Sequence, residues 1–320
     1  MTSAGAATAR PEIPAALLGG LLLAGGFMAF TAWDQSYWWR VKEDYSFGWL
    51  VPLFVAYLVH DRWPRLLGCL QSRRAGDHSG ARPPALLTGF ALVAVAGGAV
   101  LFLTGAFYRA AAGPTHFSTL TITLGMAALV LPTLYLLAPG SAADRRAAAG
   151  LFVFPTLLWL VSAPLLSVIE NNLNVFLMRQ VTTVVFSLFD LLGFPLLQRG
   201  NVLVLPTGNV GVEEACSGIR SLTGCFFAGS FLAAVFLRSR WKQAALMAAS
   251  LVFAFAANLL RSVFLTSWAY RHGAKSIEGT VHDLSGYSVL ALTVVALLAH
   301  LPLLHRRPDR RPRSSPVSAG

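Results

Sequence analysis

Charged side chains are scarce in this sequence of 320 residues. Only 12% of the residues are Asp, Glu, Lys or Arg, while 55% are hydrophobic. Soluble domains normally contain about 25% charged residues, so the composition excludes an ordinary soluble protein and predicts an integral membrane protein. Apolar runs of spanning length occupy most of the chain, which favours one polytopic bundle over two soluble domains.

Cysteine is also rare, with Cys69, Cys216 and Cys225 as the three examples. Their spacing fits neither a disulfide framework nor a metal-ligand set. Cys216 and Cys225 are nine residues apart on one predicted helix, where about 100° per residue places them on opposite faces. A metal site from Cys216, His272 and His282 is an alternative that no ligand spacing supports. We therefore expect no metal and no cofactor.

Apolar runs long enough to cross a membrane occur eight times, allowing about 20 residues for each crossing. They lie at residues 12–32, 46–60, 85–107, 117–138, 147–169, 218–237, 243–268 and 285–304. The second run is short and contains Pro52, so seven spans are the main alternative. The first run lacks the features of a cleavable signal peptide and should remain as an anchor. The sequence thus predicts an all-α polytopic membrane protein with about eight transmembrane helices.

The net charge of +11 comes from basic residues clustered between or after the apolar runs. Most of the 25 Lys and Arg residues fall on the inner side if the N-terminus is cytoplasmic, which predicts cytoplasmic N- and C-termini. These clusters are topology signals for a lipid bilayer, and they do not indicate a nucleic-acid partner. The segment after residue 305 is rich in Arg, Pro and Ser, so residues 306–320 are predicted to form a disordered cytoplasmic tail.

The longest segment between spans runs from about residue 170 to residue 214, on the outer side in this topology. Its first part is amphipathic enough to lie on the membrane surface as a helix. Its second part contains the turn signals Gly200-Asn201 and Gly208-Asn209 between β-branched and Leu residues, which indicate a hairpin-like cap. We expect residues 1–305 to form a single transmembrane domain with this small outer-face cap between spans five and six.

A cysteine with polar neighbours stands where the sixth span enters the membrane from outside. Cys216 is followed by Ser217 and Arg220 and preceded by Glu213 and Glu214. The positive end of the helix and the Arg220 cation favour a thiolate, which is the nucleophilic form of cysteine. The alternative is that Cys216 is a small apolar helix residue, but its polar neighbours argue against that interpretation.

Two further polar residues reach the same face of the membrane. Arg261 lies three residues after Asn258 in the seventh span, and an arginine in an apolar segment marks a functional site unless it only snorkels to the interface. His282 lies in the predicted outer loop before the eighth span, where it is either idle in solvent or a general acid and base. Cys216, Arg261 and His282 thus converge from three helix ends.

These residues carry a family resemblance. The motifs "EEACSGIRS" at 213–221, "NLLR" at 258–261 and "HDLSG" at 282–286 occur in that order, and "YSFGWLVPL" at 45–53 precedes them. From about Trp33 to His300 the chain resembles the exosortase/archaeosortase family of membrane cysteine transpeptidases. One departure is Phe47, which stands where the family often has histidine, and this leaves the subgroup and its recognition motif open.

The resemblance implies that Cys216 is the nucleophile, Arg261 its positively charged partner and His282 the third catalytic residue. Glu214 and Asn258 would be supporting residues, as would Ser217 and Arg220 beside the thiol. The implied substrates are exported proteins that end in a short motif, often Pro-Glu-Pro-like, then one transmembrane helix and a basic tail. Cleavage would occur at the outer face of the bacterial inner membrane. The alternatives are a polytopic transporter and a non-catalytic factor for envelope or exopolysaccharide assembly.

Overall fold

Long helices dominate the computed structural model, which describes residues 13–75, 84–211 and 218–305. A backbone in lipid must satisfy its own hydrogen bonds, and apolar runs therefore fold as helices. The helices are α1 (Ala15–Val41), α2 (Val51–Ala75), α3 (Ala85–Ala112), α4 (His116–Leu137), α5 (Ala142–Ser162), α6 (Ser167–Leu191), α8 (Gly218–Phe236), α9 (Arg240–His272) and α10 (Thr280–His305). Two 3₁₀ helices, η1 (Glu43–Leu50) and η2 (Ala274–Ile277), lie before α2 and α10.

Six helices of the described residues are long and apolar enough to cross a membrane, namely α1, α3, α4, α8, α9 and α10. The number rises to seven if α5 and α6, which are bent by 76° relative to each other, form one broken span. The second predicted span falls on η1 and the start of α2, where the apolar run ends before His60, Asp61 and Arg62. The fold is that of an all-α polytopic membrane protein, while the count of eight spans stays a prediction.

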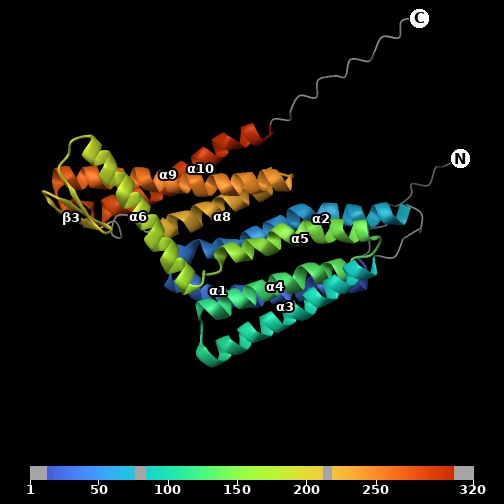
Figure 1. Ribbon diagram of the computed structural model, residues 1–320. Coiled ribbons are helices and arrows are strands. Elements are labelled where there is room, and N and C mark those ends of the chain that lie inside the picture. The colour runs from blue at the N-terminus through green and yellow to red at the C-terminus, as the bar shows by residue number, and fades with distance from the viewer. Residues whose placement is uncertain (1–12, 76–83, 212–217, 306–320) are drawn as a thin grey trace, which may run out of the picture.

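The helices form two groups that lie side by side (Figure 1). Helices α1 to α5 pack around one core, and α8, α9 and α10 pack around another. Between them, η1 contacts α1, α2 and α5 on one side and α8 on the other. The first residue of α1 and the last of α10 lie at the end of the molecule opposite the strands (Figure 1), as expected if both termini emerge on one side of the membrane.

The closest helix pair is α3 with α4. A Cβ atom on Gly125 of α4 would lie 2.4 Å from the backbone nitrogen of Phe102, and one on Gly98 of α3 would lie 2.8 Å from the backbone of Ala128. Neither position has room for a side chain. Small residues allow the two helix backbones to come into direct contact, which is a common way of packing helices in lipid.

The cap consists of α6 and a three-stranded antiparallel sheet. Strands β1 (Leu197–Arg199), β2 (Val202–Leu205) and β3 (Gly208–Gly211) follow one another in the order β1-β2-β3. Leu203 pairs with Gln198 on one side and Val210 on the other. The predicted hairpin therefore has a third strand. The buried side of β2 packs on α6 and α9 through Leu203 and Leu205.

Several helix boundaries differ from the prediction, two of them close to the candidate site. The fifth span was expected to run to residue 169, but α5 ends at Ser162 because Ala163 is extended and Pro164 follows it; proline disfavours helix at the residue before it. The predicted outer loop before the eighth span is short, since α9 continues to His272 and α10 begins at Thr280. His282 consequently lies in the first turn of α10, not in a loop.

Candidate active site

A cavity of about 290 Å³ lies between η1, α8, α9 and α10. Helices α8 and α10 begin at the end of the molecule nearest the cap (Figure 1), and their residues at the cavity lie within the first turns. Charged side chains of both signs line one end of the cavity and apolar side chains the other. The lining residues are Glu43, Asp44, Ser46, Phe47, Arg220, Ser221, Gly224, Arg261, His282, Asp283, Gly286, Tyr287 and Leu290.

Arg261 is the buried cation of this cavity, with only 7% of its surface exposed. Its Nε donates to Ser285 Oγ at 2.9 Å, and its Nη2 donates to the His282 carbonyl at 3.1 Å. Both bonds cross from α9 to α10. Ser285 Oγ donates in turn to the His282 carbonyl at 2.7 Å. These contacts fix the guanidinium at the cavity wall, so a solvent-snorkelling position is excluded for Arg261.

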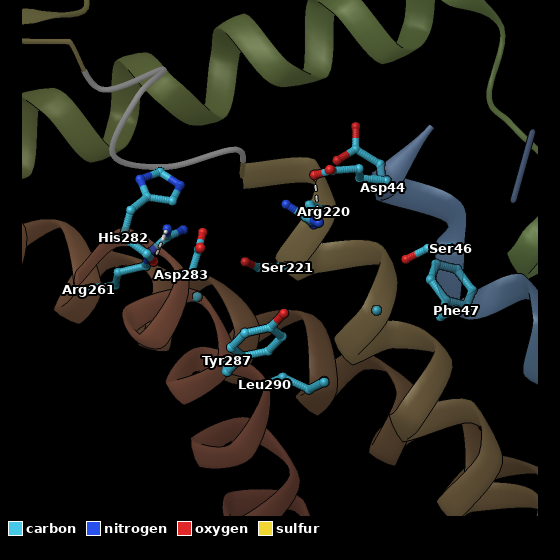
Figure 2. A pocket seen from close by; sticks show the side chains of 13 residues that line it. Asp44, Ser46, Phe47, Arg220, Ser221, Arg261, His282, Asp283, Tyr287 and Leu290 are labelled. Carbon is cyan, nitrogen blue, oxygen red and sulfur yellow. Dashed lines mark hydrogen bonds and ion pairs between the residues drawn. The ribbon is translucent and has the colours of Figure 1, made fainter. Parts of the chain in front are cut away.

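His282 enters the cavity from the first turn of α10. Its ring lies close to Arg261, whereas Arg220 and Asp44 lie at the other side of the cavity (Figure 2). Asp283 follows His282 in sequence and also lines the cavity. Gly286 lies one turn further along α10, where a Cβ atom would be 3.6 Å from Arg261 Nη2. The two motifs "NLLR" and "HDLSG" are thus in direct contact.

Arg220 lies in the first turn of α8 and pairs with a residue far away in sequence. Its Nη2 is 2.7 Å from Glu43 Oε2, and both side chains are largely exposed. The neighbouring Thr223 Oγ1 donates to the Asp44 carbonyl at 3.0 Å, which also ties α8 to η1. Desolvation by burial raises the pKa of the Asp44 carboxyl, against the attraction of Arg220.

A second polar cluster anchors η1. The buried Tyr45 hydroxyl accepts from the Leu165 backbone N–H at 3.1 Å and lies 3.5 Å from Glu170. Glu170 also pairs with Lys42 at 2.6 Å, and His116 Nδ1 is 3.8 Å away. Desolvation raises the pKa of the Tyr45 phenol, so this hydroxyl stays protonated. The cluster holds η1 against the break between α5 and α6.

The predicted site residues therefore fall into three groups. The structure brings Arg220, Arg261 and His282 together at one cavity. Asn258 is buried on α9, one turn before Arg261, and does not line the cavity. His272 ends α9 and stacks on Trp268 at 4.4 Å.

The third group lies outside the described residues. It contains Cys216 with its neighbours Glu213, Glu214 and Ser217. Cys216 precedes the first residue of α8 by two positions in sequence.

The acidic residues of the cavity were not predicted as site residues. Glu43 and Asp44 belong to η1, just before the "YSFGWLVPL" stretch, and they meet α8 only through the tertiary fold. Asp283 stands inside a predicted motif but had no role assigned. Within the described ranges, no three His, Cys, Asp or Glu residues are placed to hold a metal ion.

The cavity offers chemistry suited to a carbonyl substrate. A buried guanidinium can stabilise a developing oxyanion, and an imidazole beside it can exchange protons with a nucleophile or a leaving group. A family model described as transmembrane exosortase (Exosortase_EpsH) matches residues 38–299 of the chain. No curated protein and no solved structure matches the sequence.

Proposed function

Because the chain belongs to the transmembrane exosortase family, we propose that it is a membrane cysteine peptidase or transpeptidase. Its substrates are exported proteins that carry a C-terminal sorting signal with a short motif, one transmembrane helix and a basic tail. The reaction takes place at the outer face of the bacterial inner membrane. Residues 1–305 act as one transmembrane domain, and residues 306–320 form a cytoplasmic tail.

The observation that carries this proposal is the meeting of Arg261 and His282 at one cavity that Arg220 also lines. Cys216 stands four positions before Arg220, a distance over which even an extended chain reaches at most about 14 Å. This short separation in sequence supports a location of the thiol at the same cavity. Glu214, Ser217 and Asn258 would then orient the nucleophile and its partners.

In the proposed mechanism, the Cys216 thiolate attacks the scissile carbonyl carbon and forms a tetrahedral intermediate. The Arg261 guanidinium stabilises the negative oxygen of that intermediate. His282, which took the proton from the thiol, gives it to the leaving amine as the carbon–nitrogen bond breaks. An amine acceptor or water then resolves the thioester and regenerates the thiol.

The orientation rests on the distribution of basic residues. Arg145 and Arg146 begin α5, and Arg240 and Lys242 begin α9. These positions lie at the end of the helices away from the strands (Figure 1). The excess of positive charge there supports a cytoplasmic location for that end. The cavity would then face the periplasm.

The function is tested by co-expressing the chain with a periplasmic reporter that ends in a sorting signal taken from the same genome. We expect Cys216→Ala to abolish the size shift of the reporter on a gel, since the thiol forms the covalent intermediate. Cys69→Ala is the matched control, because Cys69 is an exposed thiol on α2. Undiminished processing by Cys216→Ala would contradict the proposal.

A further inference from the structure

The cavity changes from charged to apolar along the helices that form it. On α10 the lining residues run from His282 and Asp283 through Tyr287 to Leu290. At 1.5 Å rise per residue, His282 and Leu290 are about 12 Å apart along the helix. The same order holds on α8, where Arg220 stands at the charged end and Gly224 lies one turn further into the membrane. We call Phe47, Gly224, Tyr287 and Leu290 the apolar end of the cavity.

The apolar end is open and not filled by the protein. Tyr287 is 73% exposed and Leu290 is 44% exposed. A Cβ atom built on Gly224 would meet nothing within 4 Å, other than its own helix and chain neighbours. The helix α8 therefore presents a smooth surface there. A second helix could approach its backbone closely, as helices do at small residues in lipid.

Aromatic rings continue this surface along α2 and α8. Phe47 stacks on Phe227 at 4.9 Å between ring centroids, and Phe54 lies between Phe227 at 5.4 Å and Phe231 at 3.9 Å. Tyr57 follows at 6.3 Å from Phe231 and is largely exposed. Phe227 is buried, with 4% of its surface exposed, while Phe47, Phe54 and Phe231 are half-buried. The half-buried rings and Tyr57 form the apolar surface that extends from the cavity away from its charged end.

This order of polarity matches that of a sorting signal, in which a polar motif is followed by an apolar helix. We infer that the transmembrane helix of the substrate packs against the apolar end of the cavity, with its outer turns beside Leu290 and Gly224. The scissile bond is then held next to Arg261 and His282. This inference rests on the proposed function, and it adds the surface that binds the substrate and the side from which it arrives.

Helix α10 offers a stringent control, because it has a second apolar groove on its other face. That groove, between α9 and α10, is lined by residues that include Phe264, Leu284 and Leu292, and Arg261 borders it as well. Leu290 and Leu292 are two residues apart, so about 200° separates their directions. Both are leucines of similar exposure, at 44% and 50%. They differ in which groove they line.

The test places the photocrosslinking amino acid p-benzoylphenylalanine at position 290 or at position 292. Both chains also carry Cys216→Ala, so that the reporter with its sorting signal remains uncleaved. We expect irradiation of membranes to give a crosslinked product from position 290 and little from position 292. A stronger product from position 292, equal products from both positions, or no product from either would overturn the inference. The last two results would indicate lipid or non-specific contact.

A second measurement uses a substitution that fills the apolar end. Gly224→Leu should slow reporter processing about tenfold or more, as overpacking of a helix contact does. Gly97→Leu on α3 is the matched control, since Gly97 is an exposed helical glycine whose Cβ would also meet nothing within 4 Å. Equal processing by the two variants, at equal amounts of folded protein, would contradict docking at Gly224.

Failure of the inference can be told apart from failure of the function. If the unsubstituted chain processes the reporter but the stronger crosslinked product comes from the chain with the photocrosslinking amino acid at position 292, the function stands and the docking surface is wrong. If the unsubstituted chain leaves every signal-bearing reporter intact, the proposed function is wrong and the inference is lost with it.

Discussion

In the α1–α5 half of the molecule, buried polar side chains bond to one another, whereas in the α8–α10 half the buried Arg261 lies at the wall of a cavity. Gln35 Nε2 donates to Thr123 Oγ1 at 2.8 Å and to the Trp159 carbonyl at 3.2 Å, and Ser162 Oγ donates to Gln35 Oε1 at 2.7 Å. These bonds join α1, α4 and α5. The side-chain polar groups of Gln35, Thr123 and Ser162 are thus hydrogen-bonded within the protein.

A buried ion pair belongs to the same half. Arg109 Nε lies 2.9 Å from Oδ1 of Asp34, whose side chain is fully buried. The contact is a close ion pair in which Arg109 Nε–H makes no hydrogen bond to the Asp34 carboxylate. The guanidinium also lies 4.5 Å above the Trp33 ring. The opposite charges of Arg109 and Asp34 therefore neutralise each other inside the protein.

Charged residues in apolar helices have different surroundings in the two halves. Both halves contain an arginine in the C-terminal half of an apolar helix, Arg109 on α3 and Arg261 on α9. The structure separates them, because Arg109 pairs with a buried carboxylate while Arg261 borders open space beside His282. We therefore expect the first to serve stability, while a role of the second in the reaction stays a proposal.

The largest expected effect is on stability, in the α1–α5 half. Arg109→Met leaves the Asp34 carboxylate buried without its cation, which typically costs about 3–5 kcal/mol. We expect a much lower midpoint of thermal unfolding in detergent, with reporter processing per folded molecule unchanged. The double variant with Asp34→Leu should recover much of the loss, since it removes both charges. A processing defect at equal folded amounts would mean that Arg109 also serves the reaction.

The next effect is on activity, in the α8–α10 half. Arg261→Met removes the proposed oxyanion partner and should slow reporter processing by about 10²–10³-fold. Arg261→Lys keeps the charge but loses the planar fork that bonds both Ser285 and the His282 carbonyl, so it should restore only part of the rate. Thermal unfolding of the same variants is the control. Normal processing by the Arg261→Met chain would show that Arg261 takes no part in the mechanism.

The sequence predicts the helices well where apolar runs decide them, and less well where polar residues continue a helix. The run at residues 85–107 becomes α3 (Ala85–Ala112), but α1 extends past its predicted end at residue 32 to Val41. Asp34 and Gln35 make that extension look like a loop, although they are buried against other helices. The helical extension depends on contacts with residues that are distant in sequence, and the local sequence pattern carries no information about those contacts.

The site was predictable to a similar degree. Arg261 stands out because a charged residue is costly in an apolar segment, and His282 because it was expected in an outer loop on the same face as the thiol. The structure places both at one cavity. Glu43 and Asp44 were missed because they precede an apolar run and resemble an ordinary interfacial loop. The contacts of Glu43 with Arg220 and of the Asp44 carbonyl with Thr223 span about half of the chain. The location of Cys216 relative to these groups stays a prediction.

A smaller effect should follow the loss of Gln35. Gln35→Leu removes three hydrogen bonds, but Thr123 and Ser162 each keep a bond to a backbone carbonyl of their own helix. The expected loss of unfolding free energy is therefore about 1–3 kcal/mol. It should appear as a lower thermal midpoint, with processing per folded molecule preserved. Slower processing at equal folded amounts would show that the two halves are less separate than proposed.

The smallest effect concerns the exposed pair of Glu43 with Arg220. Exposed ion pairs contribute about 0–1 kcal/mol, so Glu43→Gln should leave the thermal midpoint nearly unchanged. Its influence should appear instead in the proposed thiol chemistry, because the substitution leaves the positive charge of Arg220 without its carboxylate.

We expect Cys216 of the Glu43→Gln chain to react with a membrane-impermeant thiol reagent at slightly lower pH, and that of Arg220→Gln at higher pH. Salt should reduce both shifts, since the charges are screened by solvent. The measurement uses the Cys69→Ser background, which removes the exposed thiol of the described residues. The absence of a shift in both variants would place the reactive thiol outside the field of Arg220 and separate the cysteine from the cavity.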